Sequence, residues 1–148
     1  AEDVLSGARA TLRARTLVNA AGPWADDVIA RTDGAEETPK AVRLVRGGHI
    51  VVPRMFEHDR AYILQHTDGR IVFAIPYEDD FTLIGTTDVD HHGPPETARC
   101  EDGEADYLVA AVNAYFRKPI QRQDIVWRYA GVRALHADAS GAASKASR

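Results

Sequence analysis

The first third of the chain has the polarity pattern of a strand, a turn and a helix. Residues 12–20 end in a run of apolar side chains, which predicts a buried parallel strand. Gly22 then stops the strand, and Pro23 suits the first turn of a helix because its missing N–H would have no partner there. Asp26 and Asp27 follow in the first turn of the helix, where the helix dipole favours negative charge. The helix is expected to end near residues 33–34.

From residue 42 onward the apolar positions recur with the shorter period of β-strands. The predicted strands cover residues 42–53, 61–65, 71–77 and 81–88. Asp68 and Gly69, between the second and third strands, are a strong signal for a tight hairpin. Residues 71–77 are apolar on both faces, so we expect this strand to be central. Together the four segments predict an antiparallel meander.

A helix and a last strand complete the pattern. Residues 104–117 carry an apolar stripe at helical spacing, follow several acidic residues and precede Pro119, all of which predicts a helix. Residues 125–135 predict the final strand. The expected fold class is α+β, with an antiparallel or mixed sheet, helices on one side of it, and a short Rossmann-like strand, turn and helix before it. The expected units are residues 1–38, residues 39–135 and a loop or tail over residues 136–148.

Composition and charge narrow the classes of function. The chain has 148 residues, 45% of them hydrophobic, enough for one core of ordinary size. Its net charge is −4, with acids and bases interspersed, so we expect no nucleic-acid partner. Cys100 is the only cysteine, which excludes an internal disulfide and is typical of a reducing compartment. Because no apolar run approaches the roughly 18 residues of a membrane span and no signal peptide is present, we expect a cytoplasmic location. Peripheral membrane contact and a homodimer stay open.

Both ends of the chain are typical of a piece cut from a longer protein. The first residues predict a hairpin that turns at Ser6 and Gly7. Residues 136–148 form a tail of small residues that stops abruptly. We therefore expect a fragment.

Gly22 is the first residue with candidate chemistry. A glycine between a strand and a helix lets the backbone approach a ligand closely, and the helix N-terminus behind it suits a phosphate. This order is typical of nucleotide-binding α/β proteins, yet the chain contains no G-x-G-x-x-G. An ordinary turn that needs a small residue is the alternative.

Arg133 on the last predicted strand is a second candidate. It shares one face with Trp127, Tyr129, Gly131 and Leu135. An arginine in such apolar surroundings is costly to bury without an anionic partner. That partner is either a structural carboxylate, such as Asp88, or the phosphate or carboxylate of a ligand, for which the guanidinium fork is well shaped.

Histidine and cysteine provide the remaining candidates. His49 follows two glycines within a strand, so it is either a hydrogen-bonded structural residue or one that a ligand approaches closely. His91 and His92 are adjacent, and adjacent side chains of an extended chain point apart, so we expect no metal site. Cys100 has no histidine partner implied by spacing, and we expect no nucleophilic role for it.

Four segments of the chain, taken in order, resemble one enzyme family. They are LVNAAGPWADDV, RGGHIVVPR, YILQHTDGRIVFAIPYEDDFTLIGTTDVD and DIVWRYAGVRAL. This series resembles FAD-dependent glycerol-3-phosphate dehydrogenase, the aerobic, quinone-linked enzyme of the FAD-dependent oxidoreductase (D-amino-acid oxidase-like) superfamily. The resemblance implies that the G-x-G-x-x-G lies upstream of this chain. It also implies that residues 1–38 end one segment of the FAD domain and that residues 39–135 form the substrate-binding cap, with a strand returning to the flavin.

The resemblance also implies roles for particular residues. Ala21, Gly22, Trp24 and Gly131 would lie against FAD, and Arg133 would bind both the flavin and the substrate phosphate. Arg148 matches a second phosphate-binding arginine of the family, and His49 is carried over as an active-site candidate. The family usually has proline after the GVR triplet, where this chain has Ala134, so the rigidity of the turn that follows is in question.

The activity that the resemblance implies is oxidation of sn-glycerol 3-phosphate to dihydroxyacetone phosphate. Electrons would pass through FAD to a membrane quinone at the cytoplasmic face of the inner membrane. The isolated chain would lack the FAD cradle, so we expect neither stable FAD binding nor turnover from it alone. Two alternatives stay open: an oxidase of the same superfamily acting on an amino acid or sarcosine, and a non-catalytic binding module with the cap fold.

Overall fold

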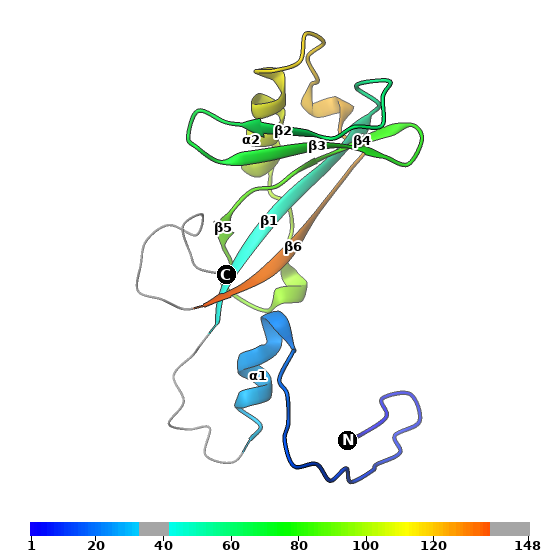
Figure 1. Ribbon diagram of the computed structural model, residues 1–148, viewed down its shortest axis with the longest axis vertical. Coiled ribbons are helices and arrows are strands. Elements are labelled where there is room, and N and C mark those ends of the chain that lie inside the picture. The colour runs from blue at the N-terminus through cyan, green and yellow to red at the C-terminus, as the bar shows by residue number, and fades with distance from the viewer. Residues whose placement is uncertain (33–41, 137–148) are drawn as a thin grey trace.

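The computed structural model describes residues 1–32 and 42–136 (Figure 1). The elements are η1 (Gly22–Trp24), α1 (Ala25–Ile29), β1 (Val42–Pro53), β2 (Tyr62–Gln65), β3 (Ile71–Tyr77), β4 (Phe81–Gly85), β5 (Val89–Asp90), η3 (Pro95–Thr97), α2 (Asp102–Asn113), η4 (Arg122–Asp124) and β6 (Trp127–His136). The expected α+β class is confirmed. Among the described residues, no helix has both the length and the apolar character needed to cross a membrane.

Strand β1 organises the sheet. It pairs with β4 and β5 along one edge and with β6 along the other, and every pairing in the sheet is antiparallel. The strand order is β2-β3-β4-β1-β5, with β6 on the far side of β1. Figure 1 shows β1 and β6 as a long two-stranded ribbon that extends beyond the shorter strands. The meander is therefore present, and the last strand pairs with the first strand of the sheet.

The two faces of the sheet differ in what covers them. Because side chains alternate along a strand, the even-numbered positions of β1 lie on one face, which α2 covers and which we call the core face. The core cluster joins this face to α2 through fully buried aliphatic side chains, among them Ile50, Val72, Ile84, Leu108 and Val112. Burial of this stripe is the reason the helix folds against the sheet, since a short isolated helix is marginal in water.

We call the opposite surface of the sheet the open face, because many of its large apolar side chains stay partly exposed, although Val45 and Val51 of β1 are buried there. The strand register places Ile63, Phe73, Gly85, His49 and Tyr129 in one row across five strands on this face. Several large apolar side chains stay partly exposed there, including Ile63, with an exposed fraction of 69%. The expectation of a central β3 is met only in its pairing, because one of its two apolar faces is open. An exposed apolar patch of this kind marks an interaction or ligand site.

Helix α2 begins and ends at polar contacts. Its first turn forms a capping box in which the Glu104 side chain accepts a hydrogen bond from the Glu101 backbone N–H at 3.0 Å. At the other end the Asn113 side chain exchanges two 2.8 Å hydrogen bonds with the backbone of Ile120. These bonds fix the chain after the helix, which therefore ends at residue 113 rather than at the expected residue 117.

The amino-terminal segment departs most from expectation. The predicted strand over residues 12–20 is wrong: the segment is irregular, and Leu12, Leu17 and Val18 are at least 73% exposed. A strand is stable only when its backbone groups pair with neighbours, and no described residue pairs with this segment. The hairpin at Ser6 and Gly7 is confirmed, with Gly7 at a positive φ of 70°.

Candidate functional site

Arg133 lies on the open face of β6 and is held by the segment that follows β4. Its Nη1 donates to Asp88 Oδ1 at 2.5 Å and to the Thr87 carbonyl at 3.4 Å, and its Nη2 donates to Thr86 Oγ1 at 2.8 Å. Of the two partners that the sequence left open, the structure shows the carboxylate. The side chains of Arg133 and Asp88 nevertheless stay 29% and 27% exposed, so the pair borders solvent rather than the core.

Gly47 makes room for the guanidinium of Arg133. A Cβ at this position would lie 2.6 Å from Arg133 Nη2 and would also collide with the Thr86 hydroxyl. Only glycine lets the arginine lie flat across β1 at this point. The guanidinium therefore lies two residues along β1 from His49.

His49 lies beside Arg133 on the open face and over Gly85 of β4, where a Cβ would come within 2.8 Å of His49 Nε2. Its ring stacks on that of Tyr129, with 4.8 Å between centroids and 6° between planes. Burial lowers the pKa of His49, and the positive charge of Arg133 acts in the same direction. The Gly47 backbone acts in the opposite direction, but the effect of burial is larger. His49 Nδ1 is buried with no hydrogen-bond partner among the described residues.

This pair defines what the open face can do chemically. A neutral imidazole can accept a proton from a hydroxyl group, while the neighbouring guanidinium can bind an anion. The arginine also keeps the imidazole neutral, because a second positive charge beside it is unfavourable. An anionic alcohol is the kind of small molecule that uses both groups at once.

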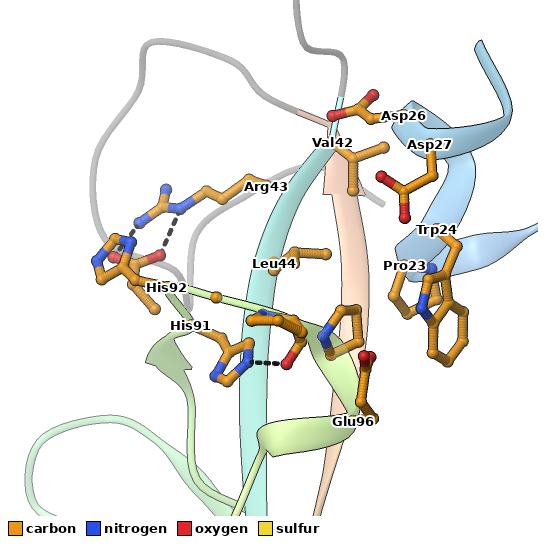
Figure 2. A pocket seen from close by; sticks show the side chains of 14 residues that line it. Pro23, Trp24, Asp26, Asp27, Val42, Arg43, Leu44, His91, His92 and Glu96 are labelled. Carbon is orange, nitrogen blue, oxygen red and sulfur yellow. Dashed lines mark hydrogen bonds and ion pairs between the residues drawn. The ribbon is translucent and has the colours of Figure 1, made fainter. Parts of the chain in front are cut away.

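The turn that was expected to touch a cofactor lies elsewhere. Trp24 lines a cavity of about 880 Å³ together with Val42 and Leu44, as Figure 2 shows. Val42 and Leu44 are even-numbered positions of β1, on the opposite face from His49. Neither Arg133 nor His49 lines this cavity.

The backbone of the turn itself is well defined. Gly22 has a positive φ of 54°, which favours glycine, and an added Cβ would meet nothing within 4 Å. The Asn19 side chain accepts from the Ala21 N–H at 3.2 Å and donates to the Ala25 carbonyl at 2.9 Å. Gly131 on the open face of β6 likewise has free space above it. Arg148 lies outside the described residues.

The acidic and histidine-rich segment near the same cavity is held by internal bonds. Asp90 accepts two hydrogen bonds from Arg43, at 2.7 and 2.8 Å, and His91 Nε2 lies 3.0 Å from the Pro94 carbonyl (Figure 2). Within residues 1–32 and 42–136, no group of three or more His, Cys, Asp or Glu side chains could hold a metal ion. Burial raises the pKa of the Cys100 thiol to about 11, and the charge of Glu104 adds to the shift, so the thiol stays protonated at neutral pH.

Thr86 is a site residue that sequence reasoning missed. It contacts Arg133, and its signal was present in the GTTD segment, where polar residues follow an apolar strand directly. Its neighbour Thr87 points to the core face and donates to Glu104 at 2.6 Å. Glu104 belongs to the acidic start of the helix, and no local pattern in the sequence shows that it faces the sheet.

Comparisons with known proteins give the family. The family described as "FAD dependent oxidoreductase" matches residues 2–146, and the chain belongs to this family. Among curated relatives, the aerobic glycerol-3-phosphate dehydrogenase of Escherichia coli (strain K12) is 47% identical over 95% of this chain and 28% of its own length. The glycerol-3-phosphate dehydrogenase of Pseudomonas tolaasii is 48% identical over 90% of this chain and 26% of its own length. The resemblance seen in the sequence motifs is thereby confirmed.

Two further relatives extend the comparison. The D-erythritol 1-phosphate dehydrogenase of Brucella abortus (strain 2308) is 43% identical over 97% of this chain and 28% of its own length. The X-ray structure of the glycerol-3-phosphate dehydrogenase from Bacillus halodurans, complexed with FAD, superposes with a TM-score of 0.73 at 32% identity, covering 91% of this chain and 27% of that one. The chain thus spans between a quarter and a third of the length of each of these relatives.

Proposed function

We propose that this chain is the central part of an FAD-dependent dehydrogenase that oxidises the C2 hydroxyl of sn-glycerol 3-phosphate to the ketone of dihydroxyacetone phosphate. The observation that carries the proposal is the pairing of Arg133 with a neutral His49 on one open face of the sheet. The names of the relatives support the choice of substrate, because glycerol-3-phosphate dehydrogenases match over nine-tenths or more of this chain.

Arg133 has capacity for a phosphate beyond its internal bonds. A guanidinium carries more N–H donors than the three bonds to residues 86–88 use. The side chain of Arg133 is also 29% exposed, which supports access of a ligand to it. We propose that Arg133 binds the phosphate, with Asp88 and Thr86 fixing the orientation of the guanidinium, and that Arg148 is a second phosphate ligand. Binding at the phosphate aligns the reacting carbon at a distance from it.

Two features of the open face support a contact with the flavin ring. Gly131 leaves free space beside Arg133, and the neighbouring exposed side chains are apolar and aromatic. We propose Gly131 and Arg133 as contacts of the flavin end of FAD. Ala21, Gly22 and Trp24 are proposed contacts away from the reacting end, since the cavity that Trp24 lines includes neither His49 nor Arg133. FAD, when bound, supplies the acceptor for the hydride that leaves C2.

The chain's own contribution to the chemistry is positioning and proton transfer. His49 is proposed to take the hydroxyl proton, because its lowered pKa keeps the imidazole neutral, and therefore able to accept a proton, at pH 7. The stacked ring of Tyr129 fixes the plane of the imidazole. Arg133 holds the anionic end, so the two groups orient the substrate from opposite ends.

Three further parts of the proposal rest on the likeness to aerobic dehydrogenases. The electrons leave the flavin for a membrane quinone, the intact protein acts at the cytoplasmic face of the inner membrane, and any contact with the membrane is peripheral. A homodimer is compatible with these proposals. The exposed apolar side chains of the open face meet the remainder of the parent chain rather than solvent.

The test uses the full-length protein that contains this chain. Anaerobic bleaching of the flavin absorbance is measured with glycerol 3-phosphate, glycerol, sarcosine and glycine. Fast bleaching by glycerol 3-phosphate alone is the expected result. Bleaching by sarcosine or glycine instead would assign the protein to the amine oxidases of the family, and no bleaching by any of the four would favour a non-catalytic module. The isolated 148-residue chain is expected to lose FAD on gel filtration.

A second substrate has a specific observation in its favour. The D-erythritol 1-phosphate dehydrogenase relative covers 97% of this chain at 43% identity. D-erythritol 1-phosphate has the same anionic end and an alcohol to oxidise, so Arg133 and His49 could serve it in the same way. The ratio of the two kcat/KM values on the full-length protein separates the two dehydrogenases.

A further inference from the structure

Glu104 is buried far more than a helix cap requires. Its exposed fraction is 7%, although it lies in the first turn of α2 and its cap partner Glu101 is exposed. One carboxylate oxygen lies 2.8 Å from Arg46 Nη2 and 3.0 Å from the Glu101 backbone N–H, and the other accepts from Thr87. A capping glutamate needs only the backbone bond. The remaining two bonds direct the carboxylate into the sheet.

A relay of hydrogen bonds runs from Glu104 into β1. The Thr87 hydroxyl donates to Glu104 Oε1 at 2.6 Å, and the oxygen of that hydroxyl accepts from the Gly48 backbone N–H at 2.7 Å. The direction of both bonds is fixed, because a carboxylate only accepts and a backbone N–H only donates. Thr87 is 1% exposed, so each of these bonds is shielded from water.

The relay ends one residue away from the groups of the candidate site. Gly48 lies between Gly47, which supports the guanidinium of Arg133, and His49. The pattern repeats on the segment after β4, where Thr87 lies between the two residues whose side chains hold Arg133. Thr87 points to the core face, where it bonds Glu104, and its two neighbours bond Arg133 on the open face.

The core face beneath Gly48 has no room for a side chain at this position. A Cβ at Gly48 would lie 2.9 Å from Cys100 Sγ, 3.1 Å from Glu104 Oε1 and 3.2 Å from Thr87 Oγ1. Groups of the core face therefore lie close beneath the β1 backbone at the point where the open face carries His49.

We propose that Glu104 is a positioning residue of the substrate site, which acts through Thr87 to hold both the backbone of His49 and the segment that grips Arg133. This proposal rests on the proposed function, because the property it explains is the geometry of a substrate site. Glu104 touches neither substrate nor cofactor. Its effect is transmitted by two hydrogen bonds across the sheet.

The test compares variants of the full-length flavoprotein by kcat and KM for glycerol 3-phosphate, each expressed per bound flavin. Thr87→Val removes the relay while leaving Arg46 and the helix cap intact, and it is expected to lower kcat/KM by roughly tenfold or more. Thr87→Ser keeps the hydroxyl and is expected to stay within about threefold of wild type. Glu101→Gln is the matched control: Glu101 bonds Arg46 at 3.1 Å and belongs to the cap but has no bond to Thr87, so kcat/KM should be unchanged.

Normalisation to bound flavin separates positioning from stability. A purely structural role would lower the yield of flavin-loaded protein and leave kcat/KM per flavin at the wild-type value, which would overturn the proposal. An equal loss in Glu101→Gln and Thr87→Val would overturn it as well, because the helix cap alone would then explain the effect. If Thr87→Val does not fold, Thr87→Ala removes the same hydroxyl and leaves Arg46 and the helix cap intact, with at least about a fivefold loss expected. A wild-type protein that does not oxidise glycerol 3-phosphate would refute the proposed function. An active wild type whose kcat/KM per flavin is unchanged in the Thr87 variants would refute only the positioning role of Glu104.

Discussion

Replacement of Arg133 by alanine is the most direct test of the site. The guanidinium is about three-tenths exposed and Asp88 already balances its charge, so the site is only partly desolvated. Removing one partner of a charged pair from a fully desolvated site costs about 2–5 kcal/mol, and we place this substitution at the lower end, at about 2–3 kcal/mol. At about 1.4 kcal/mol per factor of ten, kcat/KM for glycerol 3-phosphate should fall roughly 30-fold to 150-fold.

The substrate comparison makes this prediction specific. Glycerol has no phosphate, so its slow oxidation should depend little on Arg133, and the preference for glycerol 3-phosphate over glycerol should collapse in the variant. Arg133→Lys keeps the positive charge but not the paired N–H donors of the guanidinium. Its kcat/KM for glycerol 3-phosphate should therefore lie between those of Arg133→Ala and wild type. The control is Arg128→Ala on the same strand, since Arg128 forms a comparable 2.5 Å ion pair with Asp102 but on the core side of the sheet.

The assay is anaerobic flavin reduction by stopped flow on the full-length protein, with flavin content measured for each variant. Arg128→Ala is expected to stay within about twofold of wild type, as for an exposed ion pair of small net effect. The reasoning is refuted if Arg133→Ala keeps kcat/KM within about twofold of wild type at unchanged flavin content. An equal loss with glycerol and with glycerol 3-phosphate would also refute it, because Arg133 would then not act through the phosphate.

Three further predictions concern pH and stability. Because burial and Arg133 lower the pKa of His49, the acid limb of kcat/KM should have its midpoint below pH 6.5, and a midpoint above that value would exclude His49 as the base. The Arg70 guanidinium lowers the pKa of Asp68 to about 2. The stability that this ion pair contributes is therefore present above about pH 4 and is lost as the pH falls toward 2. Asp68→Asn should remove this loss of stability at low pH, as measured by urea titrations of the full-length protein. Leu108→Ala in the core should lower the free energy of unfolding by about 2–5 kcal/mol, and Ile63→Ala on the open face by less than about 1 kcal/mol unless the parent chain covers it, with circular dichroism as the measure.

Local chemistry along the chain predicted the strands well. The bounds of β1 and β3 agree with the expected ranges residue for residue, because a run rich in apolar residues that is bounded by turn-forming residues marks a strand locally. The hairpin at Asp68 and Gly69 follows from the backbone freedom of glycine, which has a φ of 82° here. Residues 12–20 show the limit of the same reasoning. Their apolar run is real, but a parallel strand needs neighbours that the described chain does not provide.

The candidate site was predictable in its residue types and unpredictable in its partners. Arg133 could be singled out because a cation among apolar neighbours needs an anion. Asp88 and an external phosphate were equally good answers until the register of β1 and β6 placed the guanidinium over Gly47, next to the segment after β4. Likewise, His49 was recognisable as unusual after two glycines, but its stacking on Tyr129 depends on a strand pairing between residues far apart along the chain.

The amino-acid sequence by itself determined where the chain is extended, where it turns, and that it carries a cation and an imidazole with no local partners. The tertiary structure alone decided which face of the sheet stays open, and that Thr87 and Glu104 lie beneath the residues of that face. The physical reason is the range of the interactions. Alternation, turns and caps depend on neighbours within a few residues, whereas the pairing of buried polar groups depends on the register of strands that meet only after the whole sheet has formed.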